Sequence, residues 1–156
     1  MAESLSRPPK AAHHFHRVAI LFAGGPAPGA NAVISTAATS FMRNDTEVVG
    51  MKHGYSSLAD FSSDKPLVEG KDYINVTPEF LKRTRSGQGI MLGTARTNPG
   101  KHISDPAHFD DEERVKPLKN TYEGLLSLGV EALISIGGDD TLTGNVVVVV
   151  VVTRRF

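Results

Sequence analysis

The sequence predicts an α/β fold, a parallel sheet with flanking helices, and three observations carry this prediction. Short apolar runs end in glycine near residues 18–23 and 131–136, as strands buried on both faces do. Patterns of strand, helix and strand follow one another within about 35 residues, which suits a βαβ unit. The chain has 156 residues, enough for one domain with a sizeable core.

The first βαβ unit is predicted over residues 18–51. The apolar run 18–23 leads into a glycine-rich loop. From 30 to 43 apolar residues recur at helical spacing, and Asn44-Asp45 ends the helix. The run 46–51 is the second strand. Because such crossovers are right-handed, we expect two parallel strands with the helix packed on the sheet.

The middle of the chain carries weaker patterns. Gly54-Tyr55 predicts a turn into a short helix that ends at Phe61, and residues 65–76 predict an irregular hairpin. Residues 84–99 alternate glycines with one apolar cluster. That pattern favours a loop that enters a short strand and leaves by a turn.

The last predicted helix and strand lie close together. Residues 110–128 begin with four acidic residues and stop at Gly129, which predicts a helix whose dipole is complemented by charge. The strand 131–136 follows and ends in two glycines.

The chain divides into three segments: a disordered leader at 1–16, the domain at 17–145 and an anomalous valine-rich tail at 146–156. Seven consecutive valines begin the tail where the pattern calls for a helix. Each valine disfavours a helix by roughly 0.6 kcal/mol relative to alanine, so the run favours a strand or aggregation. A homopolymer has no distinct face and therefore cannot define its own register.

Composition limits the partners. Seventeen basic and 17 acidic side chains cancel, so no global field attracts nucleic acid or a membrane surface, and any anion site must be local. The absence of cysteine fits a reducing cytoplasm. No signal peptide or membrane-length apolar run is visible. We expect a cytoplasmic protein whose partners are small molecules or proteins, with no nucleic acid and no membrane.

A glycine-rich loop, Gly24-Gly-Pro-Ala-Pro-Gly-Ala-Asn31, lies between the first strand and the first helix. Backbone N–H groups and the helix dipole at such a place bind phosphate. A dinucleotide site would need G-x-G-x-x-G and an acidic residue at the end of the second strand, whereas Glu47 opens that strand. The loop predicts a phosphate site of another kind, unless a tight turn alone requires the glycines.

Two further loops carry charge. Arg96, just after Leu92-Gly-Thr-Ala, would bring a fixed positive charge suited to clamping phosphoryl oxygens. Asp139 and Asp140 follow two glycines. Two carboxylates repel a phosphate unless a metal ion intervenes or one of them stands where a phosphate would otherwise lie.

The three loops are expected to meet. Because the carboxyl ends of parallel strands share one edge of a sheet, residues 24–29, 93–97 and 137–141 can line a single crevice. Arg83 and Arg85 either join its basic rim or are ordinary solvated side chains.

The segments GGPAPGAN, LGTART and IGGDDTL, in this order, resemble the amino-terminal half of the 6-phosphofructokinase family over residues 17–145. The resemblance implies a Rossmann-like phosphofructokinase N-terminal domain, here truncated, of the pyrophosphate-dependent type. It also implies that a phosphoryl group is transferred to fructose 6-phosphate in glycolysis, giving fructose 1,6-bisphosphate. Pyrophosphate is the expected donor, and ATP is the less expected one. Mg²⁺ is the implied cofactor, and the family is usually homo-oligomeric.

The resemblance assigns roles position by position. The implied donor-binding residues are Gly25, Arg96, Gly138, Asp139, Asp140 and Thr141. Gly25 would contact the donor through its backbone, Arg96 would clamp its phosphates, and Asp139 would hold Mg²⁺. The position of Asp140 is glycine in ATP-using members and aspartate in pyrophosphate-using ones, where the carboxylate takes the space of the α-phosphate and thereby selects the donor.

The chain departs from the family in two respects. It has no T-I-D-N-D motif, which carries the family's catalytic base, and no second domain to hold the sugar phosphate, so we expect it to be inactive alone. Ser35 and Thr39 stand where bacterial allosteric members have arginines, so effector control of that kind is not expected.

Two alternatives remain open. The chain could be a non-catalytic fragment that acts as a binding or assembly module by pairing its valine strand with a partner's sheet edge. It could also be a kinase of the NAD kinase or diacylglycerol kinase type, which would account for the 137–141 loop alone.

Overall fold

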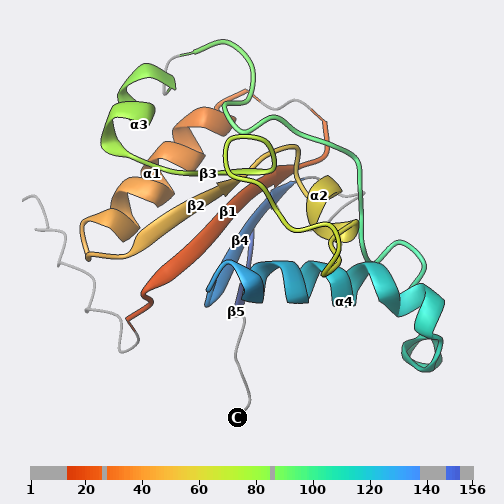
Figure 1. Cartoon of the computed structure of the whole chain (residues 1–156). Coiled ribbons are helices and arrows are strands. Elements are labelled where there is room, and N and C mark those ends of the chain that lie inside the picture. Colours follow the sequence, from red (N-terminus) through yellow and green to blue (C-terminus); the bar gives the residue numbers. More distant parts are fainter. Residues whose placement is uncertain (1–13, 26–27, 85–86, 138–146, 152–156) are drawn as a thin grey trace, which may run out of the picture.

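The computed structural model describes residues 14–25, 28–84, 87–137 and the backbone of 147–151, and its centre is a five-stranded sheet with the strand order β3-β2-β1-β4-β5 (Figure 1). The strands are β1 (Arg17–Ala23), β2 (Glu47–Met51), β3 (Tyr73–Asn75), β4 (Ala132–Gly137) and β5 (Val147–Val151). The predicted runs for β1, β2 and β4 are therefore confirmed to within one residue at each end.

The centre of the sheet is parallel and its two edges are antiparallel. β1 pairs in parallel with β2 on one side and with β4 on the other. β3 runs antiparallel to β2, and β5 antiparallel to β4. The prediction of a parallel sheet is thus correct for the core and wrong for both edge strands. Residues 138–146 are too few for the long crossover that would make β5 parallel to β4.

Helices cover both faces of this sheet (Figure 1). They are α1 (Ala30–Met42), α2 (Ser56–Ala59), α3 (Pro78–Thr84) and α4 (Glu112–Ser127), with a 3₁₀ helix, η1 (Pro106–Asp110), just before α4. The helices predicted for α1, α2 and α4 are confirmed in place. The Asp111 carboxylate caps α4 by accepting from the N–H groups of Glu113 and Arg114, at 3.1 and 3.3 Å.

Side chains of β1 alternate between two apolar cores, as the two-residue period of a strand requires. Val18, Ile20 and Phe22 pack with α1 and α3, on the face where Ile34 and Leu81 lie. Ala19, Leu21 and Ala23 pack on the opposite face with α2 and α4, where Leu58 and Leu125 lie. β1 is therefore buried on both faces, which is why its sequence reads as an unbroken apolar run.

The middle of the chain differs from the sequence-based expectation. Residues 65–76 do not form a hairpin of their own; β3 lies within this range and pairs instead with β2. The short strand expected within 84–99 is absent from residues 87–99, which contact the sheet through loop backbone. α3 was missed, although its start is marked by Thr77, whose hydroxyl accepts from the Phe80 N–H at 3.2 Å, and by Pro78 in the first turn.

Residues at both ends of the predicted domain take part in the fold. Phe15, within the segment expected to be a disordered leader, packs against the apolar core beside α1, and its carbonyl accepts from the Thr46 hydroxyl at 2.8 Å. At the other end, the strand expected for the valine run is confirmed over β5, which adds to the sheet of its own chain. Residues 1–13 and 152–156 lie outside the described part.

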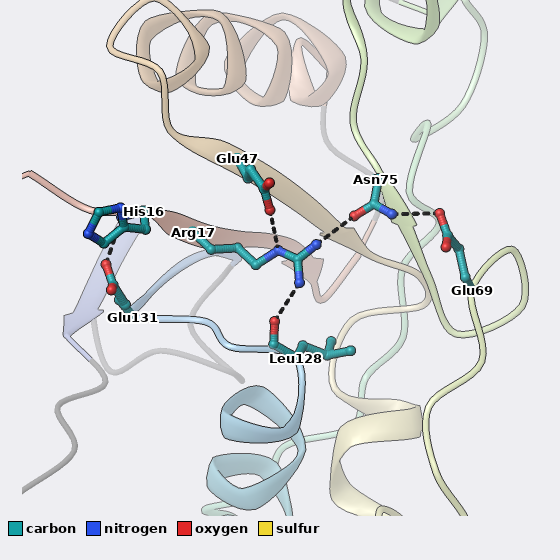
Figure 2. Close-up of polar contacts among 7 residues, drawn as sticks. All are labelled: His16, Arg17, Glu47, Glu69, Asn75, Leu128 and Glu131. Atoms are coloured by element: carbon teal, nitrogen blue, oxygen red, sulfur yellow. Dashed lines mark hydrogen bonds and ion pairs between the residues drawn. The ribbon is translucent and has the colours of Figure 1, made fainter.

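A network of polar side chains closes the amino-terminal edge of the sheet (Figure 2). Arg17 at the start of β1 forms an ion pair with Glu47 at the start of β2, with 2.9 Å between Nε and Oε2. Its two Nη atoms donate to the Leu128 carbonyl at the end of α4, at 2.7 Å, and to the Asn75 side chain of β3, at 3.3 Å. One guanidinium thus joins three strands and a helix, and its charge suits the helix carboxyl end.

Among the described residues, no helix has the length and apolar character needed to cross a bilayer.

Candidate functional site

The topology places a switch point between β1 and β4 (Figure 1). The chain leaves β1 for β2 on one side, and it later returns to β4 on the other side. In open α/β sheets ligands bind in the crevice at the carboxyl ends of the strands at such a point. Ala23 and Gly137 are paired neighbours there, so the loops that follow β1 and β4 start side by side.

The loop after β1 leaves the start of α1 open to an anion. Gly24, with φ 113°, turns the chain out of the strand, and Gly29, with φ 82°, is the N-cap of α1. Because Gly29 has no side chain and the first turn of α1 holds no acidic residue, the positive end of the helix is not neutralised locally. Gly25 is exposed, and a Cβ built on it would meet nothing within 4 Å.

The loop that carries Arg96 is attached to this first loop. The Gly24 N–H donates to the Ala95 carbonyl at 2.9 Å, and the Thr94 hydroxyl donates to the Gly24 carbonyl at 2.7 Å. At the end of β2, the His53 N–H donates to the Leu92 carbonyl at 2.8 Å. Gly24 and residues 92–95 therefore meet at the carboxyl edge of the sheet, as expected for their two loops, although hydrogen bonds between loops bring them there rather than a preceding strand.

Gly93 is tightly enclosed where it passes β2. Its φ is 67°, and a Cβ at this position would lie 2.7 Å from Nδ1 of His53. His53 itself adopts a positive φ of 56°, which is unusual for a residue other than glycine. Both the backbone conformation and the imidazole therefore require glycine here, and sequence reasoning had not assigned His53 any part in the site.

Arg96 extends from this enclosed segment into solvent. Its side chain is exposed and forms no hydrogen bond or ion pair with the rest of the described chain. A guanidinium in that state is available for an anion. Two more arginines were candidates for the basic rim of the crevice. Arg83 lies exposed on α3, and Arg85 is outside the described residues.

The third loop is described only at its start. β4 ends at Gly137, which is buried beside Ala23. The four residues expected to complete the site lie outside the described residues: Gly138, Asp139, Asp140 and Thr141. Within the described ranges no group of three or more His, Cys, Asp or Glu side chains could hold a metal ion.

Asn31 is the polar residue that sequence reasoning overlooked. It lies in the first turn of α1, is 8% exposed, and forms three hydrogen bonds with the backbone of residues 87–91. One sequence signal was available. Asparagine is a poor helix former except near helix ends, so Asn31 at the predicted helix start suggested a side chain that bonds to backbone.

Two side chains with shifted pKa values, Tyr55 and Asp72, lie near the sheet but are not part of the crevice. Burial raises the pKa of the Tyr55 hydroxyl, an effect that its hydrogen bond to Ser135, at 2.8 Å, opposes in part. Burial would also raise the pKa of Asp72, but hydrogen bonds from Ser57 and from the Val68 N–H, with two nearby lysines, lower it overall. Both groups are held by their partners, so we assign them structural roles.

Comparison with known proteins gives consistent results. A family model described as Phosphofructokinase matches residues 17–148. The pyrophosphate–fructose 6-phosphate 1-phosphotransferase of Thermotoga maritima is 37% identical over 127 residues, which are 80% of this chain and 25% of that protein. The ATP-dependent 6-phosphofructokinase of Aquifex aeolicus is 38% identical over 128 residues, 82% of this chain and 33% of that protein.

Solved structures show the same fold. The phosphofructokinase of Saccharomyces cerevisiae superposes with a TM-score of 0.61 at 23% identity, covering 82% of this chain and 14% of that one. That of Pichia pastoris in the T-state gives a TM-score of 0.60 at 20% identity, covering 86% of this chain and 13% of that one. The chain thus spans a quarter to a third of the length of the sequence relatives named above. Since the family match extends over most of it, this chain belongs to the phosphofructokinase family.

Proposed function

We propose that this chain is the phosphoryl-donor half of a 6-phosphofructokinase, an enzyme that phosphorylates fructose 6-phosphate to fructose 1,6-bisphosphate in glycolysis. The observation that supports the proposal best is the attachment of the Arg96 loop to the glycine loop at the switch point of the sheet. It sets an exposed guanidinium near an uncapped helix start, and both features suit a chain of phosphates.

We further propose that the donor is pyrophosphate rather than ATP. The support is Asp140, whose carboxylate would repel the α-phosphate of ATP while leaving room for the smaller donor. The named relatives do not distinguish the two, because a pyrophosphate-dependent and an ATP-dependent protein are 37% and 38% identical to this chain.

The chemistry would be in-line phosphoryl transfer, in which protein groups position the donor and spread the developing charge. Arg96 would bind the phosphoryl oxygens, and backbone N–H groups near Gly25 would bind them as well. Mg²⁺, when bound, would neutralise charge on the donor. Its protein ligand would be Asp139, the position to which the resemblance to the family assigns the metal.

Titration calorimetry with magnesium pyrophosphate and with magnesium ATP tests the donor assignment on this chain. We expect tighter binding of pyrophosphate. Asp140→Gly should narrow or invert the difference between the two affinities, because it removes the repelling charge. Asp64→Gly, which changes an exposed aspartate in a distant loop, serves as the control and should leave both affinities unchanged. An unaltered ratio in Asp140→Gly would argue against charge exclusion.

We expect that this chain by itself does not transfer a phosphoryl group to fructose 6-phosphate. The sequence lacks the T-I-D-N-D motif expected to supply the base, so a coupled assay with fructose 6-phosphate and either donor should give the rate of the blank. Turnover above the blank would overturn this part of the proposal. A chain that bound neither donor but dimerised through β5, the last strand in the sheet order, would instead favour a non-catalytic assembly module.

A further inference from the structure

We propose that Asn31 positions residues 87–97, the arginine loop, against residues 24–29, the glycine loop. Anion binding would then depend on the Asn31 amide, although the amide does not touch the anion. The identity of the anion rests on the proposed function, whereas the attachment of the loop rests on geometry alone.

The amide of Asn31 makes three hydrogen bonds to one segment of backbone. Nδ2 donates to the Gly87 carbonyl at 3.1 Å and to the Gly89 carbonyl at 2.7 Å, and Oδ1 accepts from the Met91 N–H at 2.7 Å. Two carbonyls on one side and one N–H on the other fix the orientation of the amide. The Asn31 side chain is buried, whereas Gly87 and Gly89 are themselves exposed, so the amide holds a surface segment of backbone against the start of α1.

These contacts hold a segment that regular secondary structure does not hold. Residues 87–97 belong to no helix or strand. The bonds from Gly24, Thr94 and His53 attach the second half of this segment, from Leu92 to Ala95. Asn31 attaches the first half, so the segment is fixed at both ends before it reaches Arg96.

Asn31 also belongs to the other half of the site. It is the second residue of α1, so its backbone lies within the helix start that the glycine loop leads into. One residue therefore connects the helix start with the arginine loop. Loss of its amide should let the arginine loop move relative to α1, and the two groups that suit an anion would no longer keep a fixed separation.

Neutral substitutions test this without adding charge near the anion. Asn31→Ala removes the amide, and Asn31→Leu removes it while keeping a side chain of similar size. Asn44→Ala is the matched control, because Asn44 follows the same helix at its other end, is exposed, and donates from its side chain to the Ser40 carbonyl at 2.9 Å.

Amide hydrogen exchange is the first readout. Both Asn31 variants should exchange at least about tenfold faster over residues 87–97, because three hydrogen bonds are lost and one alone can be worth about a factor of ten, with β1 and β4 unchanged. The affinity for magnesium pyrophosphate, measured by calorimetry, should fall by about the same factor. Asn44→Ala should alter neither quantity.

Each result decides the matter. Equal acceleration over β1 and β4 would make Asn31 a general stabiliser of the fold and would overturn the inference. Local acceleration with unaltered pyrophosphate affinity would also overturn it, because the anion would then be indifferent to the loop. A wild-type chain that binds no pyrophosphate would remove the proposed function and the anion dependence with it, while exchange over 87–97 would still confirm or refute the attachment.

Discussion

The two ends of the central strands, the amino-terminal edge and the carboxyl edge of the sheet, are held together by different kinds of contact. At the amino-terminal edge, side chains pair with one another, and Arg17 joins three strands and the end of α4 (Figure 2). At the carboxyl edge the main bonds run from backbone to backbone, from Gly24 to Ala95 and from His53 to Leu92. The Arg17 guanidinium is paired at the first edge, whereas the Arg96 guanidinium is left available at the second, where the side chains of Asn31 and Thr94 help to hold the loops.

This difference suggests a division of roles. A loop fixed through its own backbone can present a side chain to solvent, as residues 92–95 do with the neighbouring Arg96. A side chain that satisfies several partners at once contributes to stability instead. Changes at the carboxyl edge should therefore alter binding more than stability, and changes at the amino-terminal edge should do the reverse.

The largest expected effect is on binding. Arg96→Ala should weaken magnesium pyrophosphate binding by about 2–3 kcal/mol, because charge-assisted hydrogen bonds to phosphate are lost. The free energy of unfolding should change by less than about 0.5 kcal/mol, since the side chain is exposed. Arg43→Ala, an exposed arginine at the far end of α1, is the control for net charge. Equal losses of affinity in both variants would make the effect non-specific and the proposed contact wrong.

The converse is expected for Arg17→Met. It should lower the free energy of unfolding by about 1–3 kcal/mol, because the Leu128 carbonyl loses a donor in a partly buried place, the Asn75 side chain loses a second one, and Glu47, which is 70% exposed, loses its ion pair. Urea denaturation measures this, and pyrophosphate affinity of the folded protein should be unchanged. Arg114→Met is the comparison, since its pair with Asp111 is nearly half exposed on both sides and should contribute about 0–1 kcal/mol. Similar losses in the two variants would contradict a special role for the Arg17 network.

A smaller effect is expected within the carboxyl edge itself. Gly93→Ala should destabilise the fold by about 1–2 kcal/mol, because alanine disfavours the positive φ and its Cβ would displace the His53 ring. Gly25→Ala should leave thermal stability nearly unchanged, because the space around Gly25 is open. Equal melting temperatures for the two variants would show that the arginine loop is not as tightly enclosed as the structure indicates.

Prediction from sequence succeeded where one local pattern decides the outcome. The apolar runs of β1, β2 and β4 identify buried strands, and α1 and α4 follow from helical spacing and end signals. The meeting of the glycine loop with the arginine loop was also predicted correctly. The reasoning behind it was partly wrong, because it included a short strand within residues 84–99 that is absent from residues 87–99.

What could not be predicted depends on contacts between distant segments. β3 is three residues long and is defined by its partner β2, and nothing in its own composition shows the pairing or its direction. Asn31 and Arg17 act through backbone carbonyls that lie 56 and 111 residues further along the chain. Such carbonyl partners are common to all residues and leave no mark in the sequence.

The central place of β1 has a consequence for how this protein is made. Of the strands in the described residues β1 is synthesised first, yet its neighbour β4 lies roughly 110 residues later, and this separation predicts slow folding. During synthesis one edge of β1 can pair with β2 early, while the other edge stays unpaired until β4 has left the ribosome. A nascent chain of this kind is expected to need protection from aggregation while the residues between β1 and β4 are translated.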